Sequence, residues 1–184
     1  MKQLLIFGAL SLSLTFTACS NNDAKEVTSA ETKEQMSTDS NTAAASPVSD
    51  NSTDLPSFKV QDVNGSTFNL QDLKGKKVFV NLWASWCPPC RREMPSIVKL
   101  ANSVDSNKVS FVLLSMDENF DKAKVFVKQQ QLSLPVFYPA ENLPVLLNVN
   151  SIPTTFIFDE NGKLIRRIDG GNDYDSQAFR ELLQ

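Results

Sequence analysis

The sequence contains no histidine and only three cysteines, and its basic residues do not gather into a stripe. The 18 lysine and arginine residues are balanced by 21 aspartate and glutamate residues, so no positively charged track is present for a nucleic-acid backbone. Without histidine, three cysteines cannot complete a zinc site of four nitrogen and sulfur ligands. We therefore expect no nucleic acid as a partner, no metal ion and no cofactor.

The chain also lacks an apolar run near its start that is long enough to cross a membrane. The stretch from Leu4 to Phe16 has about 13 residues, whereas a membrane-spanning helix needs roughly 20. It follows the basic residue Lys2 and precedes the small residues Thr17 and Ala18. This layout is typical of a secretory signal, and it predicts a signal peptide over residues 1–18.

Cys19 follows this segment directly and resembles the acylated cysteine of a bacterial lipoprotein. Phe16 departs from that pattern, which usually has leucine there. The alternative is an ordinary signal peptide with an incidental cysteine. A multiply acylated Cys19 would hold the protein on a bacterial membrane without a spanning helix. We expect an exported, lipid-anchored protein whose domain lies outside the cytoplasm, on the periplasmic side.

Residues 19–54 are rich in serine, threonine, asparagine, acidic residues and alanine and contain no aromatic residue. Such a composition cannot bury enough apolar surface to offset the entropy of ordering the chain. We predict a lipid-anchored disordered linker with a reach on the order of 30 Å. The single folded domain then covers residues 55–184, a length that suits one hydrophobic core.

Apolar runs and turn signals in this domain predict an α/β arrangement with a mixed sheet. The turn signals are Asn64-Gly65 and Asn161-Gly162, each between two short apolar segments. The predicted strands are residues 58–60, 67–70, 77–83, 109–114, 154–158 and 163–168. The predicted helices are residues 88–104, 120–131, 142–149 and a last one ending near residue 183, capped by Asp173 or Asp175.

Cys87 and Cys90 stand three residues apart between a predicted buried strand and a predicted helix. Disulfide exchange needs one accessible thiolate that attacks and a second thiol that resolves the mixed disulfide. Just before a helix, unpaired amide groups and the positive end of the dipole favour a thiolate at Cys87. Cys90, one turn later, is close enough to form the bridge and less exposed. The pattern therefore predicts a redox-active pair.

The alternative is a structural disulfide in an exported protein. Trp86 precedes the pair, and Pro88 and Pro89 separate its two cysteines. These neighbours, together with the place between strand and helix, favour the redox interpretation.

Two segments carry a resemblance to a known family: VNLWASWCPPCRREMP at residues 80–95 and IPTTF at residues 152–156. Together they resemble the thioredoxin superfamily, and within it the membrane-tethered TlpA/ResA-type proteins, also described as redoxin-like. The resemblance covers residues 55–184. It implies a thioredoxin-like fold, in which helices flank a central mixed β-sheet, with an N-terminal β-hairpin and a central insertion.

The resemblance also assigns roles to individual residues. Cys87 matches the nucleophile and Cys90 the resolving cysteine. Pro153 matches a cis-proline that faces the disulfide, and Ile152 before it would offer backbone hydrogen bonds to an extended substrate. We expect Trp86, Pro88 and Pro89 to belong to the substrate-binding surface as well.

Thioredoxin has a buried aspartate six residues before its nucleophile, where this chain has Asn81. An amide cannot accept the proton of the resolving thiol. TlpA/ResA-type proteins often place a carboxylate after the next strand, and Glu118 matches that position. We therefore expect Glu118 to accept the proton of Cys90, with a solvated acid at a helix start as the alternative.

The predicted activity is that of an enzyme, a thiol:disulfide oxidoreductase. The resemblance implies reduction of disulfides in exported proteins, for example in cytochrome c maturation, with electrons from a membrane donor and a monomeric protein. Three alternatives remain: a disulfide-forming oxidant, a peroxidase of the peroxiredoxin type, and a binding or chaperone module. A peroxidase would want proline and threonine before its cysteine, which residues 80–86 lack. A binding module would keep its activity after Cys87→Ser.

Overall fold

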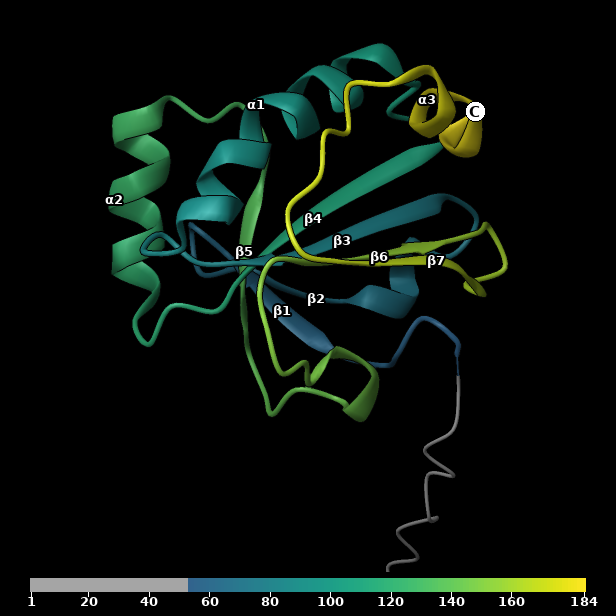
Figure 1. Cartoon of the computed structure of the whole chain (residues 1–184). Coiled ribbons are helices and arrows are strands. Elements are labelled where there is room, and N and C mark those ends of the chain that lie inside the picture. Colours follow the sequence, from purple (N-terminus) through teal and green to yellow (C-terminus); the bar gives the residue numbers. More distant parts are fainter. Residues whose placement is uncertain (1–52) are drawn as a thin grey trace, which may run out of the picture. The chain divides into compact units, whose positions relative to one another are not determined.

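The computed structural model describes residues 53–184 (Figure 1). The predicted signal peptide, Cys19 and the predicted linker up to residue 52 lie outside the described residues. Within residues 53–184, no helix combines the length and the apolar character needed to cross a membrane.

The core of the described residues is a mixed sheet with the strand order β2-β1-β5-β4-β3-β6-β7. The central strand β3 pairs in parallel with β4 and antiparallel with β6, and β1 joins β5 antiparallel. The strands are β1 (Lys59–Asp62), β2 (Thr67–Asn69), β3 (Lys77–Trp83), β4 (Val109–Ser115), β5 (Val136–Pro139), β6 (Thr154–Phe158) and β7 (Leu164–Asp169).

The two faces of the sheet are covered differently (Figure 1). One face packs against all three α-helices, α1 (Pro88–Ser103), α2 (Phe120–Gln130) and α3 (Gln177–Leu183). The other face is covered by the chain before β1 and by two short 3₁₀ helices, η1 (Leu70–Leu73) and η2 (Val145–Leu147). Because apolar side chains cover both faces, β3 is apolar on both of its sides, apart from Lys77 at its start and the buried Asn81.

Helix α1 begins where the sequence predicts it, with Cys87 as its N-cap and prolines at its first two positions. A proline fits there because the first amide groups of a helix have no partner inside the helix. Pro95 lies within α1, yet the helix continues through it to Ser103. The exposed position of Pro95 leaves the carbonyl group that it cannot pair near water, which lowers the cost.

The structure differs from the predictions at three elements. Strand β5 was not predicted, because it is only four residues long and ends at a proline. The predicted helix at 142–149 contains only the 3₁₀ turn Val145–Leu147. Helix α3 has Ser176 as its N-cap, so the prediction of Asp173 or Asp175 was wrong. Both aspartates lie before the cap, where several polar residues in succession made the start of the helix ambiguous.

The chain enters the domain at the end of the sheet far from the cysteine pair. The backbone amide of Leu55 donates a hydrogen bond to the carbonyl of Gly162, and that of Leu164 donates one to Thr53. This segment neighbours Phe158, which pairs with Val78 at the start of β3. Thr53 and Asp54, which we had assigned to the linker, thus already contact the sheet.

Candidate active site

Cys87 and Cys90 form a disulfide at the N-terminus of α1, with their Cα atoms 5.3 Å apart. The backbone amide of Cys90 lies 3.3 Å from Sγ of Cys87 and donates toward it. After reduction, the same amide and the positive end of the 16-residue helix would face a thiolate at Cys87. The local structure therefore favours negative charge on the first sulfur of the pair.

The exposure of the pair differs from the expectation of an accessible Cys87. In the disulfide form Cys87 is only 2 % exposed and Cys90 is completely buried. The neighbouring Trp86 is 62 % exposed, the largest exposed fraction among the large apolar side chains described. The exposed apolar surface beside the pair is therefore that of Trp86 and not of the cysteines.

The segment before β6 lies beside the disulfide. The Ile152–Pro153 peptide bond is cis, as the resemblance implies. The carbonyl oxygen of Ile152 lies 3.9 Å from Sγ of Cys87. Pro153 is buried, Ile152 and Pro89 are half-buried, and Pro88 is exposed. The structure thus brings Ile152 next to the sulfur atom that is expected to react.

Glu93 is a buried carboxylate one helical turn after Cys90. It is 3 % exposed, and residues three apart on a helix are neighbours on its surface. Oε1 accepts a 2.9 Å hydrogen bond from the Asn81 side chain, and Oε2 accepts a 3.1 Å bond from the amide of Asn172. Burial raises the pKa of Glu93 to about 7, although these two hydrogen bonds oppose the shift. Glu93 can therefore gain or lose a proton near neutral pH.

We did not select Glu93 from the sequence, although a signal was present. Cys90, Ile97 and Leu100 mark the buried face of α1, and Glu93 falls on the same face. A carboxylate within an apolar stripe is unusual, because a buried charge is costly unless it is paired. The spacing of three residues from Cys90 would have singled it out.

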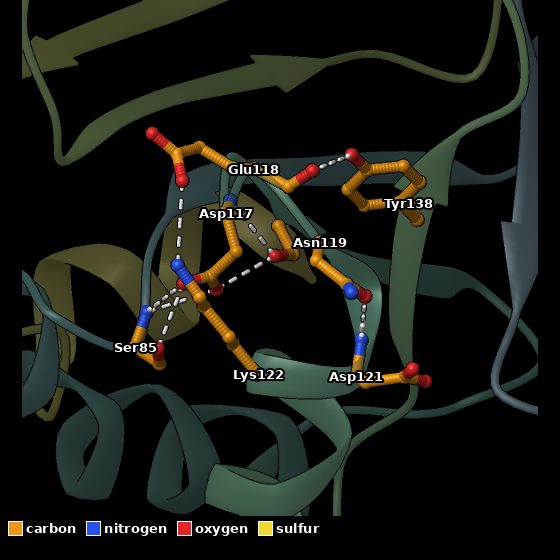
Figure 2. A network of polar contacts seen from close by, with 8 residues as sticks. Ser85, Asp117, Glu118, Asn119, Asp121, Lys122 and Tyr138 are labelled. Atoms are coloured by element: carbon orange, nitrogen blue, oxygen red, sulfur yellow. Dashed lines mark hydrogen bonds and ion pairs between the residues drawn. The ribbon is translucent and has the colours of Figure 1, made fainter.

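Glu118, the predicted proton acceptor, lies at the surface. Its side chain is 90 % exposed and forms a 3.4 Å ion pair with Lys122, which Figure 2 shows. Its backbone carbonyl accepts a hydrogen bond from the Tyr138 hydroxyl. Among the described residues, Lys122 is the partner of its carboxylate. The buried carboxylate within the cysteine helix itself is that of Glu93.

Its neighbour Asp117 is buried and holds the loop that leads to Cys87 (Figure 2). Its carboxylate accepts a 3.0 Å bond from the Ser85 amide and a 2.7 Å bond from the Ser85 hydroxyl. Ser115 at the end of β4 donates a further bond of 2.9 Å. Asp117 therefore ties β4 to the segment two residues before the nucleophile.

These parts suit a two-electron exchange between sulfur atoms. The helix terminus stabilises a thiolate, a second cysteine closes the bridge, and a buried carboxylate can take up a proton. Within residues 53–184, no group of three or more histidine, cysteine or acidic side chains is arranged to hold a metal ion.

Known proteins similar to this chain are thiol-disulfide oxidoreductases and thioredoxin-like proteins. A model of the redoxin family matches residues 50–182. The chain is 37 % identical over 118 residues to a thiol-disulfide oxidoreductase ResA of Bacillus cereus, an alignment that covers 64 % of this chain and 68 % of that protein. It is 36 % identical over 110 residues to the thioredoxin-like protein YneN of Bacillus subtilis, covering 58 % of this chain and 64 % of that protein.

Among solved structures, a thiol:disulfide interchange protein of the thioredoxin family from Chlorobium tepidum superimposes with a TM-score of 0.59. The two are 30 % identical, and the superposition covers 72 % of this chain and 96 % of the other. StoA from Bacillus subtilis, 24 % identical with a TM-score of 0.59, shares the fold over 69 % of this chain and 96 % of its own.

Proposed function

The chain belongs to the redoxin family of the thioredoxin superfamily, and from this premise we propose that it is a thiol:disulfide oxidoreductase that reduces disulfides of exported proteins outside the cytoplasm. The observation that carries the proposal is the Cys87–Cys90 disulfide at the start of α1, beside the carbonyl oxygen of Ile152.

In the reduced protein, Cys87 is the nucleophile. Its thiolate attacks one sulfur of the substrate disulfide, and the other substrate sulfur leaves as a thiolate that takes a proton from solvent. The product is a mixed disulfide between Cys87 and the substrate. The amide of Cys90, which points at Sγ of Cys87, supports the charge that the attacking sulfur carries before this step.

Substrate contacts come from the residues around the pair. Trp86 offers an exposed aromatic surface, and Pro88 and Pro89, exposed and half-buried, follow the nucleophile at the start of α1. An extended substrate segment would lie against Ile152 and Pro153, where backbone groups stand beside the sulfur.

Cys90 then resolves the mixed disulfide. Its thiol gives its proton to a carboxylate, the Cys90 thiolate attacks Sγ of Cys87, and the substrate leaves as a thiolate. Burial and the position one turn after Cys90 favour Glu93 over the exposed Glu118 as the proton acceptor. Glu118 remains the alternative, and variants of both residues separate the two.

The direction of exchange and the partners are part of the proposal. Thiols outside the cytoplasm are oxidised unless a donor keeps them reduced, so a reductase there implies a thiol reductase in the membrane. Cytochrome c precursors, whose cysteines must be reduced, are one candidate substrate class. Acylation of Cys19 would hold a monomeric enzyme near such a donor.

The reduction potential of the Cys87/Cys90 pair tests this function. The full chain, carrying Cys19→Ser so that only two thiols react, is equilibrated in defined thiol buffers, and free thiols are trapped by alkylation. A value near the reducing end of the range, about −270 mV, supports a reductase; a value near about −120 mV indicates an oxidant. Failure to form a reversible disulfide would exclude the enzyme.

A further inference from the structure

A chain of four buried polar side chains runs from the active-site helix across the sheet to the segment before α3. Glu93 is 3 % exposed, and Asn81, Thr155 and Tyr174 are completely buried. The Asn81 amide nitrogen donates 2.9 Å hydrogen bonds to both Glu93 and Thr155. The Thr155 and Tyr174 hydroxyls are 2.7 Å apart, and either of them can be the donor. We call these four residues the Asn81 network.

One atom of the Asn81 network has no partner. Oδ1 of Asn81 is buried and forms no hydrogen bond with any of the described residues. The nitrogen at the other end of the same amide makes both bonds. A half-turn of the amide would place Oδ1 where the nitrogen now lies, within 2.9 Å of Glu93 Oε1 and of Thr155 Oγ1. Each orientation leaves one end unpaired, so the proton positions of Glu93 and Thr155 decide between them.

The present orientation suits an ionised Glu93. The carboxylate accepts from the Asn81 nitrogen, Thr155 accepts from it too, and the Thr155 proton is free to go to Tyr174. The opposite orientation suits a neutral Glu93. The O–H of the protonated Glu93 carboxyl and the hydroxyl of Thr155 would then both donate to Oδ1 of Asn81. Tyr174 would donate to Thr155. In each hydrogen bond of the network, the donor and the acceptor thus exchange roles.

We propose that the Asn81 amide turns over when Glu93 takes up the proton of the Cys90 thiol, so that Thr155 and Tyr174 are positioning residues that set the proton affinity of Glu93. This rests on the proposed function. In the step itself, the S–H bond of Cys90 breaks and an O–H bond of Glu93 forms. The Cys90 thiolate then attacks Cys87, and the substrate thiolate leaves.

The pKa of Glu93, raised to about 7 by burial, supports this inference because both forms of the carboxyl are then populated near neutral pH. The other groups that face Glu93 are few. The amide of Asn172 donates to Oε2, and the side chains of Arg92 and Asp173 line the cavity next to it. The Asn172 amide thus binds Oε2 of the carboxyl, whereas Asn81 binds Oε1.

Thr155→Val tests the network because it removes the hydroxyl but keeps the shape of the side chain. With Glu93 ionised, valine leaves one Asn81 N–H without an acceptor. With Glu93 neutral, it removes only one of two donors to Oδ1, which costs less. The ionised form therefore loses more, and the midpoint of the Glu93 titration rises by roughly 0.5 to 1 pH unit. Thr155→Ser, which keeps the hydroxyl, leaves the midpoint unchanged.

The measurement is a ¹³C NMR titration of the Glu93 carboxyl in the disulfide form of the full chain with Cys19→Ser. The midpoint of the pH profile of thiol exchange is measured in parallel. A rise with valine but not with serine supports the network. No rise with valine, an equal rise with serine, or a loss of rate that is uniform across pH would each overturn it.

Two measurements keep the test decisive where Thr155→Val does not fold. Tyr174→Phe also raises the midpoint of the Glu93 titration, because the Thr155 proton then lacks an acceptor when Glu93 is ionised. Tyr138→Phe, a change outside the network, leaves this midpoint unchanged. In the unchanged sequence, the side-chain N–H signals of Asn81 shift with the same midpoint as Glu93. Signals that stay constant through this titration contradict the turnover. A chain without exchange activity would refute the proposed function, yet the titration would still report on the network.

Discussion

The side-chain amide of Asn81, in the central strand, donates a 2.9 Å hydrogen bond to the carboxylate of Glu93 on the active-site helix. The bond lies between two layers of the fold and leaves Glu93 3 % exposed. One neutral hydrogen-bond donor and the amide of Asn172 are its described partners, so the charge is buried without a cation against it. Ionisation of Glu93 is therefore expected to destabilise the fold.

The stability of the disulfide form should fall as the pH rises from about 4.5 to about 7. In this window an unfolded chain has lost the Glu93 proton, whereas the folded chain, with the pKa of Glu93 raised to about 7, retains it. We expect a loss of roughly 1 to 3 kcal/mol in the free energy of unfolding. Urea denaturation at several pH values measures it. Glu93→Gln should flatten the curve, and Glu118→Gln should leave it as it is.

The same two variants identify the proton acceptor of Cys90. Because Glu93 is buried one turn from Cys90, Glu93→Gln should lower the rate of release of a mixed disulfide by about 10²-fold and remove its pH dependence near neutrality. Glu118→Gln should change neither. Stopped-flow measurement of mixed-disulfide decay from acidic to alkaline pH gives both rates. The opposite pattern would assign the proton to Glu118.

The two cysteines should give different products when each is replaced. Cys87→Ser removes the nucleophile, so reduction of a protein disulfide falls to the background rate. Cys90→Ser leaves the nucleophile but removes the group that releases the substrate, so a covalent complex accumulates. Mass spectrometry of the unreduced mixture detects it. A complex formed by Cys87→Ser instead would reverse the roles of the two residues.

Replacing Trp86 should impair reactions with proteins more than reactions with small disulfides. Its side chain is 62 % exposed beside Cys87, so it contributes contact surface and little packing. Trp86→Ala should lower kcat/KM for a protein disulfide roughly tenfold. It should change kcat/KM for oxidised glutathione by less than about twofold. Val63→Ala, which truncates an apolar side chain 41 % exposed at the β1–β2 turn, is the control. Equal losses for both substrates would argue against a docking role.

Asp117 should stabilise the fold through its hydrogen bonds to the loop before Cys87. Asp117→Asn turns one acceptor into a donor that faces the amide and hydroxyl of Ser85, so we expect a loss of about 2 to 3 kcal/mol in stability. Asp121→Asn changes an exposed carboxylate nearby and should cost less than about 0.5 kcal/mol. Denaturant titration of both variants makes the comparison.

Local sequence signals predicted most of the fold. The continuous apolar run of β3, the Asn-Gly turns and the prolines that start α1 depend on neighbouring residues, and they were interpreted correctly. The positions of Cys87, Cys90 and Pro153 in the site followed from two short motifs. Strand β5 was missed because its place in the sheet depends on pairing with β1 and β4, which are distant in the sequence.

The polar network behind the cysteines could not be predicted for a related reason. Asn81, Thr155 and Tyr174 come from three elements, and only the packing of the helices on the sheet brings them to Glu93. A tyrosine before a terminal helix has no local mark that separates a buried hydroxyl from an exposed one. Glu93 and Asn81 had such marks, Glu93 as the charged member of an apolar helix face and Asn81 as the polar residue of an apolar strand.

The pairing of Thr53 and Leu55 with the turn before β7 fixes which end of the domain is attached to the rest of the chain. From Val78 at that end to Trp83 near the cysteines, β3 rises about 17 Å. The described chain therefore starts at one end of the central strand and carries its disulfide at the other, so residues added before Thr53 would leave the surface around Trp86 and the cysteine pair free.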